Sequence, residues 1–290
     1  MTFEQWQAQG LSFTFNGLPI RYWQAGEGEP LLLIHGFPTS SWDWHCIWES
    51  LAQHYQVIAC DMLGFGLSAK PKDLAYSLVL QADLQQALLG VLNITQPVHV
   101  LAHDYGDSVA QELLARHQEG RFNLASCVFL NGGLFPETHK PVLIQKLLLS
   151  PIGALVARLF NQKALSKSFA KIFGPNSQLN GAQLQEHWQL IAYNNGPQVM
   201  HKLISYIPER IKMRERWVSA MQHTKVPLKV IDGGFDPISG AHMVERYRAL
   251  IENADTTVLD QVGHYPQLEA PAEVLSQYQA FRMQRGNMPA

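Results

Sequence analysis

The stretch VHVLAHDYGDSVA, residues 98–110, decides the fold and carries a candidate reactive side chain. Its first five residues form an apolar, partly β-branched run that predicts a buried strand, and from Ser108 onward apolar residues recur at helical spacing. Asp104 lies between strand and helix, with the small residues Ala102 and Gly106 two positions to either side. Such spacing is typical of a sharp turn whose central side chain stands above the sheet. We therefore predict that Asp104 projects from the end of its strand, at the N-terminus of the next helix.

Length and composition favour an intracellular enzyme that works without a metal or cofactor. The chain has 290 residues, 47% of them hydrophobic, which suits one α/β domain with an insertion or two small domains. A net charge of −2 argues against a nucleic-acid partner. The N-terminus lacks the basic start and apolar core of a signal peptide, so we expect a cytoplasmic protein. Cys46, Cys60 and Cys127 show no metal-binding spacing and are predicted to be buried free thiols.

The most apolar segment, residues 141–160, is interrupted by charged and helix-breaking residues. Lys146, Pro151, Gly153 and Arg158 all fall within it. These interruptions argue against a membrane-spanning helix. We expect no membrane partner, although loose association of this segment with a membrane surface remains an open alternative. The sequence does not indicate the oligomeric state.

Strand and helix patterns alternate along most of the chain. A β-hairpin is expected over residues 11–24, with its turn at Asn16-Gly17. Further strands are predicted at residues 30–34, 56–60, 98–102, 125–130, 227–231 and 256–259. Helices are predicted after Ser40 and Ser41 and at residues 78–92, 240–251 and 271–283. This alternation predicts an α/β fold with a mostly parallel sheet and helices on both faces.

The strand pattern stops between residues 134 and 225, where the sequence is helical throughout. We interpret residues 134–225 as a helical cap inserted into the α/β core. The core itself would then consist of residues 1–133 and 226–290. Because the cap is inserted between two strands, it is expected to cover the edge at which those strands end.

Three candidate catalytic residues each follow a predicted strand closely. They are Asp104, Asp236 and His264, and the carboxyl ends of parallel strands meet at one edge of the sheet. We therefore expect them to converge as nucleophile, acid and histidine, in that chain order. Asp232 is a rival for the acid, but it lies at the strand end, and Asp236 is better placed in the loop.

An aspartate at the turn indicates a particular chemistry. With a reference pKa of about 3.9, its carboxylate is ionised at neutral pH without a base. It can attack a strained or activated sp³ carbon and form an alkyl ester. His264, oriented by Asp236, would then activate a water molecule that hydrolyses this ester. The backbone amides of Phe37 and Tyr105 are the expected oxyanion hole.

These motifs carry a family resemblance. HGFP from His35, DMLGFGLS from Asp61 and HDYG from His103 resemble α/β-hydrolases of the epoxide hydrolase and haloalkane dehalogenase group, and the epoxide hydrolase branch in particular. The stretches HGFPTSSWDW, AHDYGDSVAQELL, NGGLFPETHKP and HYPQLE resemble the mesoderm-specific transcript protein and its relatives more closely. The resemblance covers roughly residues 16–281. It implies the α/β-hydrolase fold and the triad but supplies no substrate.

Two departures from the group's pattern bear on the reaction. Its dehalogenases hold the halide with a Trp after the nucleophile and a polar residue after His-Gly, where this chain has Tyr105 and Phe37. Its epoxide hydrolases protonate the epoxide oxygen with two cap tyrosines. Here Tyr206 resembles the second one, Tyr193 is the other tyrosine of the cap, and none occurs early in the cap.

The leading hypothesis is an epoxide hydrolase-like enzyme that acts on a small apolar substrate. The first alternative is a haloalkane dehalogenase with an atypical halide site. The second is a non-catalytic binding protein built on the same fold. An ester hydrolase of the usual kind would need Ser in place of Asp104.

Overall fold

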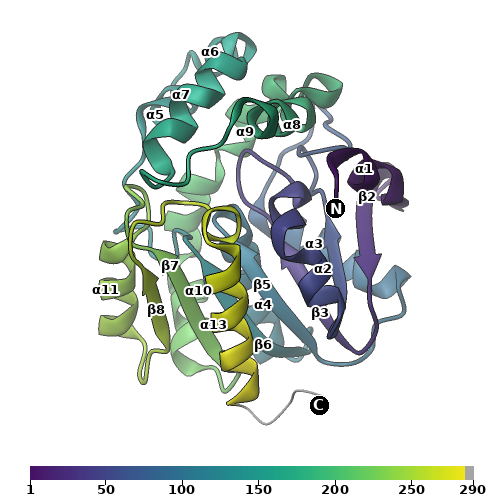
Figure 1. Ribbon diagram of the computed structural model, residues 1–290, viewed down its shortest axis with the longest axis vertical. Helices are drawn as coiled ribbons and strands as arrows, with labels where there is room; N and C mark the ends of the chain where they lie inside the picture. Colours follow the sequence, from purple (N-terminus) through teal and green to yellow (C-terminus); the bar gives the residue numbers. More distant parts are fainter. Residues whose placement is uncertain (285–290) are drawn as a thin grey trace.

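The computed structural model describes residues 1–284, and its centre is an eight-stranded sheet (Figure 1). The strand order is β1-β2-β4-β3-β5-β6-β7-β8. The strands are β1 (Leu11–Phe15), β2 (Leu18–Ala25), β3 (Glu29–Ile34), β4 (Tyr55–Cys60), β5 (Val98–His103), β6 (Leu124–Leu130), β7 (Leu228–Gly233) and β8 (Thr256–Leu259). β2 pairs antiparallel with both β1 and β4, and the pairs from β4 to β8 are parallel. The predicted parallel α/β sheet is therefore confirmed.

The N-terminal hairpin turns at the predicted Asn-Gly pair. Asn16 and Gly17 both adopt positive φ, 50° and 76°, which is the conformation that a two-residue hairpin turn requires. β5 occupies the middle of the sheet, paired with β3 on one side and β6 on the other. All six of its residues are buried, as expected for a parallel strand covered on both faces.

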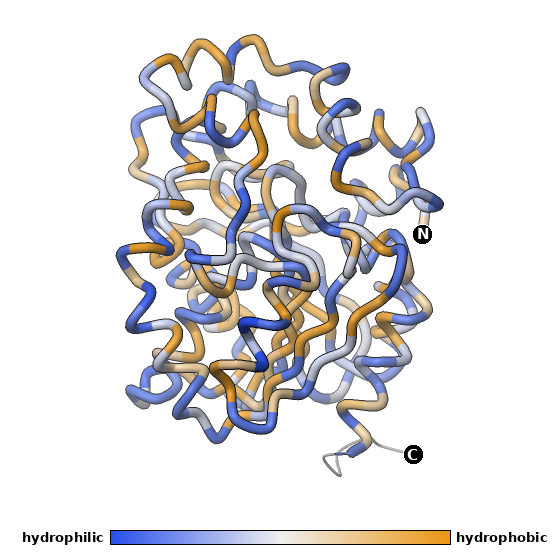
Figure 2. The backbone as a smooth tube through the Cα atoms, turned by 90° about the vertical axis from the view of Figure 1, so that its left-hand side faces the viewer, coloured by the Kyte–Doolittle hydropathy of each residue, from blue (hydrophilic) through white to orange (hydrophobic). Residues whose placement is uncertain are grey.

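Helices cover both faces of the sheet, and the alternation of side chains along the strands divides the core into two halves. In β3, Leu31 and Leu33 face one half and Leu32 and Ile34 the other. The first half is closed by α1 (Phe3–Gln9), η1 (Ser41–Trp44), α2 (His45–Ala52) and α13 (Pro271–Met283). The second is closed by α3 (Leu78–Val91), α4 (Tyr105–Gln118), α10 (Tyr206–His223) and α11 (Ala241–Leu250). Figure 2 shows hydrophobic segments gathered where these layers meet.

A helical insertion between β6 and β7 lies at the top of the molecule (Figure 1). It contains α5 (Leu143–Leu149), α6 (Gly153–Leu159), α7 (Gln162–Ile172), α8 (Gly181–Ala192), η2 (Tyr193–Val199) and α9 (Met200–Leu203), and it leads into α10. The short helix α12 (Pro266–Glu269) precedes α13.

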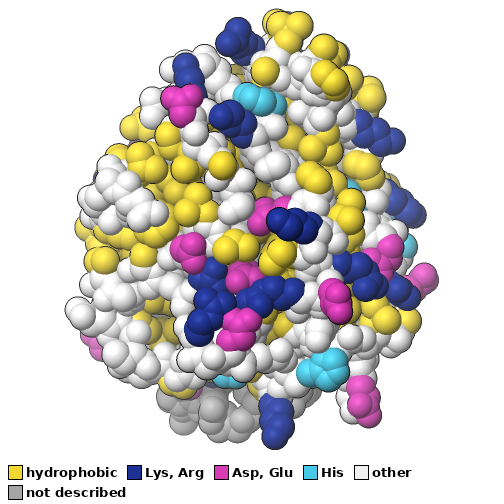
Figure 3. Space-filling model, turned by 180° about the vertical axis from the view of Figure 1, so that it is seen from behind, with side chains coloured by type: hydrophobic (Ala, Val, Ile, Leu, Met, Phe, Trp, Pro, Cys, Tyr) yellow, Lys and Arg dark blue, Asp and Glu magenta, His cyan; other side chains and the backbone are white. Residues whose placement is uncertain are grey.

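The helix α10 packs on the core rather than on the insertion alone. Its Arg216 pairs with Glu112 of α4 and with Glu119, which follows α4, and its Ala220 carbonyl accepts a hydrogen bond from Gln118. Figure 3 shows basic and acidic side chains side by side on this back surface. The C-terminal part of α10 thus belongs to the layer that covers the sheet, although it precedes the predicted boundary at residue 225. The predicted segment 226–290 includes residues 285–290, which lie outside the described residues.

Two local expectations differ from the structure, and one helix was not predicted. α4 begins at Tyr105, three residues before the predicted start, because the turn feeds directly into its first helical residue. Cys46 is exposed, whereas Cys60 and Cys127 are buried free thiols as predicted. The helix α1 was not predicted. Within residues 1–284 no helix combines the length and the apolar character needed to cross a membrane.

Candidate active site

Asp104 stands at the apex of the turn between β5 and α4. Its backbone has φ 49° and ψ −104°, a strained conformation for a residue other than glycine. A Cβ atom at Gly106 would lie 2.3 Å from the Ile34 carbonyl oxygen, so only glycine fits where the turn crosses β3. The predicted spacing of small residues therefore has a direct steric cause, and it aims the Asp104 side chain into a cavity.

Three groups contact the Asp104 residue from different parts of the chain. The Phe37 amide donates a hydrogen bond to Oδ2 at 3.1 Å. Arg210 of α10 donates to the Asp104 carbonyl oxygen at 2.8 Å, and the same Nη2 atom lies 3.6 Å from Oδ1. Arg210 is itself buried and also donates to the Ser108 hydroxyl at 2.7 Å. One carboxylate oxygen thus faces a backbone amide and the other faces a fixed positive charge.

These contacts keep the Asp104 carboxyl ionised. Burial alone would raise the pKa of Asp104, but the positive charges of His264 and Arg210 outweigh burial and lower that pKa below its ordinary value. The hydrogen bond from the Phe37 amide acts in the same direction. Asp104 is therefore a buried carboxylate at neutral pH, as a carboxylate nucleophile requires.

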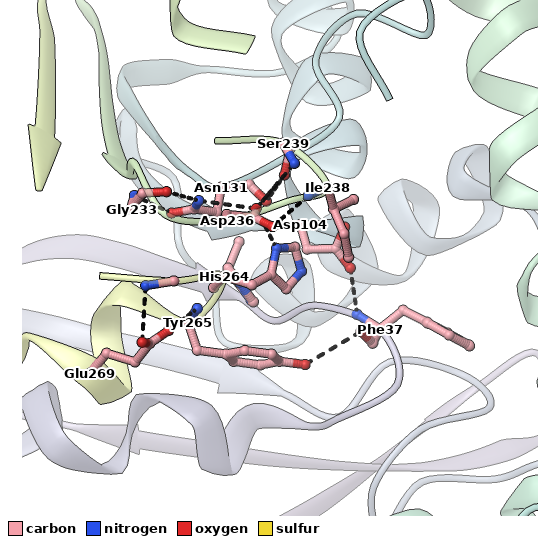
Figure 4. A network of polar contacts seen from close by, with 12 residues as sticks. Phe37, Asp104, Asn131, Gly233, Asp236, Ile238, Ser239, His264, Tyr265 and Glu269 are labelled. Carbon is pink, nitrogen blue, oxygen red and sulfur yellow. Dashed lines mark hydrogen bonds and ion pairs between the residues drawn. The ribbon is translucent and has the colours of Figure 1, made fainter. Parts of the chain in front are cut away.

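Asp236 and His264 form a short hydrogen-bonded pair beside Asp104 (Figure 4). His264 Nδ1 lies 2.7 Å from Asp236 Oδ2, while Asp232 makes no such contact. The Asp236 carboxylate is fixed by further donors, namely the Ile238 amide, the Ser239 amide and hydroxyl, and the Asn131 side chain. With Nδ1 directed at Asp236, the other ring nitrogen of His264 faces the Asp104 side of the cavity (Figure 4).

The histidine is held as a cation in this arrangement. Burial would lower the pKa of His264, but the charge and hydrogen bond of Asp236, together with the charge of Asp104, raise it to about 9. The pKa of Asp236 is correspondingly lowered, against the effect of its own burial. The three predicted residues therefore form a buried set of two carboxylates around one imidazolium.

The two predicted oxyanion donors lie in the loop after β3 and at the turn between β5 and α4. The Phe37 amide already contacts the Asp104 carboxylate. Tyr105 is the first residue of α4, so its amide is among those that a helix N-terminus leaves without an intrahelical partner. Its ring is buried and packs edge-on against Phe65 and Tyr206.

The two cap tyrosines have different surroundings. Tyr206 is buried, and its ring packs against Phe37 and Tyr105 above Asp104. Its hydroxyl oxygen accepts a hydrogen bond from Gln145 Nε2 at 3.0 Å. Tyr193 is 48% exposed and packs against Lys70, and neither tyrosine is among the residues that line the cavity at Asp104. The placement of Tyr193 does not fit the predicted role of a proton donor, because a surface side chain there cannot reach a substrate on Asp104.

A cavity of about 220 Å³ opens onto Asp104 and His264. Most of its wall is apolar. The lining side chains come chiefly from the loop after β3 and from α5, α7 and α9. Those with large apolar groups are Phe37, Leu143, Ile144, Leu147, Leu148, Phe160, Leu165, Phe169, Ile172, Met200 and Ile238. The structure therefore has a mostly apolar space next to Asp104 and His264. No group of three or more His, Cys, Asp or Glu residues within residues 1–284 is placed to hold a metal ion.

Sequence reasoning missed two residues that the structure places at this site. Arg210 lies in the charged stretch PERIKMRER, which is typical of an exposed helix face. Gln145 lies among leucines in α5, and its carboxamide is fixed by the Val142 amide, which donates to Oε1 at 3.0 Å. The only available signal for Gln145 was a polar pair, Gln145 and Lys146, in an otherwise apolar helix.

Comparisons with known proteins agree with the fold. The model of the "Alpha/beta hydrolase family" matches residues 31–277. The mesoderm-specific transcript protein of Mus musculus is 41% identical over 95% of this chain and 86% of its own length. The haloalkane dehalogenase DatA from Agrobacterium tumefaciens C58 superposes with a TM-score of 0.80 at 19% identity, covering 95% of this chain and 96% of its own. The epoxide hydrolase CorEH superposes with a TM-score of 0.75 at 19% identity, covering 95% and 98%.

The two superposed structures share the fold at an identity too low to transfer a substrate. The family match, in contrast, spans most of the sheet and all three residues of the predicted triad. The match to the mesoderm-specific transcript protein covers nearly the whole chain. On this evidence the chain belongs to the alpha/beta hydrolase family.

Proposed function

We propose that this protein hydrolyses an epoxide, or a similarly activated carbon, through an ester formed on Asp104. The observation that carries the proposal is an ionised carboxylate, rather than a hydroxyl, at the apex of the turn, beside the His264–Asp236 pair. A hydroxyl there would need a base before it could attack. The Asp104 carboxylate attacks directly, which suits an electrophilic sp³ carbon.

In the first step an Asp104 oxygen attacks a carbon of the three-membered ring. Because the Phe37 amide holds Oδ2, the oxygen left to attack is Oδ1. A C–O bond forms to Asp104, the C–O bond of the ring breaks, and the electron pair of that bond leaves on the ring oxygen. The ring oxygen then takes a proton, and the product is a hydroxyalkyl ester of Asp104.

The proton for that oxygen comes from Tyr206 in this proposal. The Tyr206 hydroxyl oxygen accepts from Gln145 Nε2, so its own proton is available to another acceptor. Gln145 lies early in the insertion, where the family resemblance led us to expect a first tyrosine. We assign the pair of Tyr206 and Gln145 as the groups that bind the departing oxygen. Burial also raises the pKa of Tyr206, which keeps the hydroxyl protonated until it is needed.

In the second step His264 activates water against the ester. Esterification removes the negative charge of Asp104, one of the causes that raise the pKa of His264. The imidazolium then loses its proton to solvent, from which Tyr206 regains the proton that it gave to the ring oxygen, and the neutral imidazole takes a proton from water. Hydroxide adds to the ester carbonyl, and the oxyanion develops on the oxygen held by the Phe37 amide. The bond between the carbonyl carbon and the alkyl oxygen breaks, that oxygen takes the proton of the new carboxyl group, and the diol leaves as the Asp104 carboxylate and the His264 imidazolium are restored.

Intact-protein mass spectrometry of the variant His264→Gln tests the proposal. The variant keeps the nucleophile but lacks the base, so the ester should accumulate when the protein is mixed with a panel of epoxides and haloalkanes. An increase equal to one intact epoxide, mapped to Asp104, is the expected result. The matched variant Asp104→Asn should show no adduct.

Other results would change the assignment. An alkyl adduct that appears with release of halide would make the protein a haloalkane dehalogenase. An adduct on any residue other than Asp104 would refute the mechanism. A folded His264→Gln variant with no adduct from any member of the panel would contradict the proposed substrate class and favour a binding protein on a hydrolase fold.

A further inference from the structure

The insertion carries an apolar surface that no part of the described chain covers. Ile152, Leu155 and Leu159 lie three and four residues apart, so they share one side of α6. Leu143 and Leu149, at the two ends of the preceding helix α5, are exposed as well. These five side chains, here called the α5–α6 face, are between 41% and 67% exposed. Soluble monomers rarely expose several large apolar residues together without a binding role.

Figure 3 shows this concentration from behind. Apolar side chains crowd the top of the molecule, where α6 lies in Figure 1, and basic side chains stand beside them. Figure 2 shows hydrophobic stretches on the same outer helices. The face therefore lies at the end of the molecule that carries the insertion, away from the edge of the sheet where the strands begin.

The segment that contains the α5–α6 face carries Lys and Arg but no acidic residue. Residues 138–185 contain no Asp or Glu, although the whole chain has a net charge of −2. The same segment contains six basic residues, Lys140, Lys146, Arg158, Lys163, Lys167 and Lys171, and every one of them is exposed. Within residues 1–284 none of the six makes an ion pair with a carboxylate. This segment therefore brings only positive formal charge to its part of the surface.

The cavity above Asp104 opens at this same end of the molecule. Leu143 is both 67% exposed and part of the cavity lining, so it connects the α5–α6 face with the interior. Lys167 and Lys171 of α7 also line the cavity and are exposed. An apolar molecule that leaves a lipid layer at the α5–α6 face would meet the entrance without crossing water.

We propose that the α5–α6 face binds the surface of a bilayer that contains anionic lipids. Apolar side chains ringed by Lys and Arg are the pattern of a protein that lies at a lipid–water interface, with the apolar groups below the headgroups and the cations among them. A second copy of this chain fits the face poorly, because a symmetric contact would bring two sets of unpaired cations together. The interaction does not depend on the chemistry proposed for Asp104.

Vesicle flotation with the full-length protein tests this inference. Vesicles of phosphatidylcholine alone are compared with vesicles that also contain about 30 mol% phosphatidylglycerol. Each basic side chain near an anionic surface contributes about fivefold to partitioning, so binding to the anionic vesicles should be at least tenfold stronger. It should also weaken at high salt, because salt screens exposed charges.

Two matched variants locate the binding surface. The variant Ile152→Ser/Leu155→Ser/Leu159→Ser changes three exposed residues of the face and should bind at least tenfold less. The control Val91→Ser/Ile211→Ser/Met283→Ser changes three residues of similar exposure (54%, 64% and 61%) elsewhere and should bind as the wild type does. Circular dichroism melting curves establish that both variants are folded.

The inference is overturned by any of three results. The wild type could fail to float with anionic vesicles, or the face variant could bind as well as the control. The third result is a wild-type dimer that the face variant converts to a monomer in light scattering, which would make the face a contact between copies of the chain.

Discussion

Replacing His264 by Gln should remove a specific pH dependence from the stability of the protein. Burial lowers the pKa of His264, but Asp236 and Asp104 raise it, with the net result that it moves from 6.5 to about 9. A pKa that is higher in the folded than in the unfolded state gives stability that is fully present below pH 6.5 and is lost as the pH rises through about 9. At about 1.36 kcal/mol per pH unit, this histidine accounts for a loss of about 3 kcal/mol over that interval.

Lys70 opposes this trend over part of the range. Burial lowers the pKa of Lys70 to about 8 from 10.5, so the unfolded chain binds more protons between these values. The contribution of Lys70 to stability therefore rises with pH where that of His264 falls. Because Lys70 is present in both proteins, the difference in unfolding free energy between wild type and His264→Gln isolates the histidine.

Urea unfolding followed by tryptophan fluorescence at pH values from 6 to 9.5 measures this difference. The advantage of the wild type over His264→Gln should shrink by about 3 kcal/mol across the range. The control variant His223→Gln, which changes an exposed histidine, should follow the wild-type profile. Parallel profiles for wild type and His264→Gln would refute the reasoning, as would an NMR titration that placed the pKa of His264 near 6.5.

The remaining predictions concern the turn, a buried acid and the proposed proton donor. Gly106→Ala places a Cβ atom 2.3 Å from the Ile34 carbonyl oxygen, so soluble expression should be lost or the melting temperature should fall by several degrees, measured by calorimetry. Burial, reinforced by the nearby Asp104 charge, raises the pKa of Asp107 well above its ordinary value, which favours the neutral acid. Asp107→Asn should therefore change the unfolding free energy by less than about 1 kcal/mol, whereas an ionised Asp107 would make this change strongly destabilising. Tyr206→Phe should slow alkylation of Asp104 by about 100-fold in single-turnover mass spectrometry, and Tyr193→Phe should leave that rate unchanged.

The parts of the fold that could be predicted from sequence depend on local rules. The hairpin at Asn16-Gly17 follows from the backbone conformations that those two residues tolerate. The turn at Asp104 follows from the steric need for a small residue at Gly106. The hydrogen bond between Asp236 and His264 agrees with the predicted convergence of loops at one edge of the sheet, because parallel strands bring their ends together whatever their separation in sequence.

The features that escaped prediction depend on distant partners. The helix α1 buries only Phe3 and Trp6, and Trp6 is held by Trp23, Trp42 and Trp48, which come from three other elements. No periodicity within seven residues could reveal such an environment. The same reason applies to the active site, where the residues of α5 and α10 that approach Asp104 resemble ordinary helix-surface positions until the insertion is placed over the sheet.

This chain has a carboxylate, Asp104, at the turn where a serine hydroxyl is usual, and a buried carboxylate needs partners from distant parts of the chain. A buried carboxylate is costly without compensation, and here the Phe37 amide, Arg210 and protonated His264 all act on Asp104. The Phe37 amide and Arg210 keep their charge state throughout the proposed reaction. The charge of His264, in contrast, depends on whether Asp104 is ionised or esterified. While Asp104 is charged, His264 is stabilised as a cation and cannot act as a base. Once Asp104 is esterified, that charge is gone and the pKa of His264 falls. In the proposed reaction, electrostatics therefore favour a neutral, basic His264 after Asp104 has reacted rather than before, because the Asp104 charge is one of the causes that raise the pKa of His264.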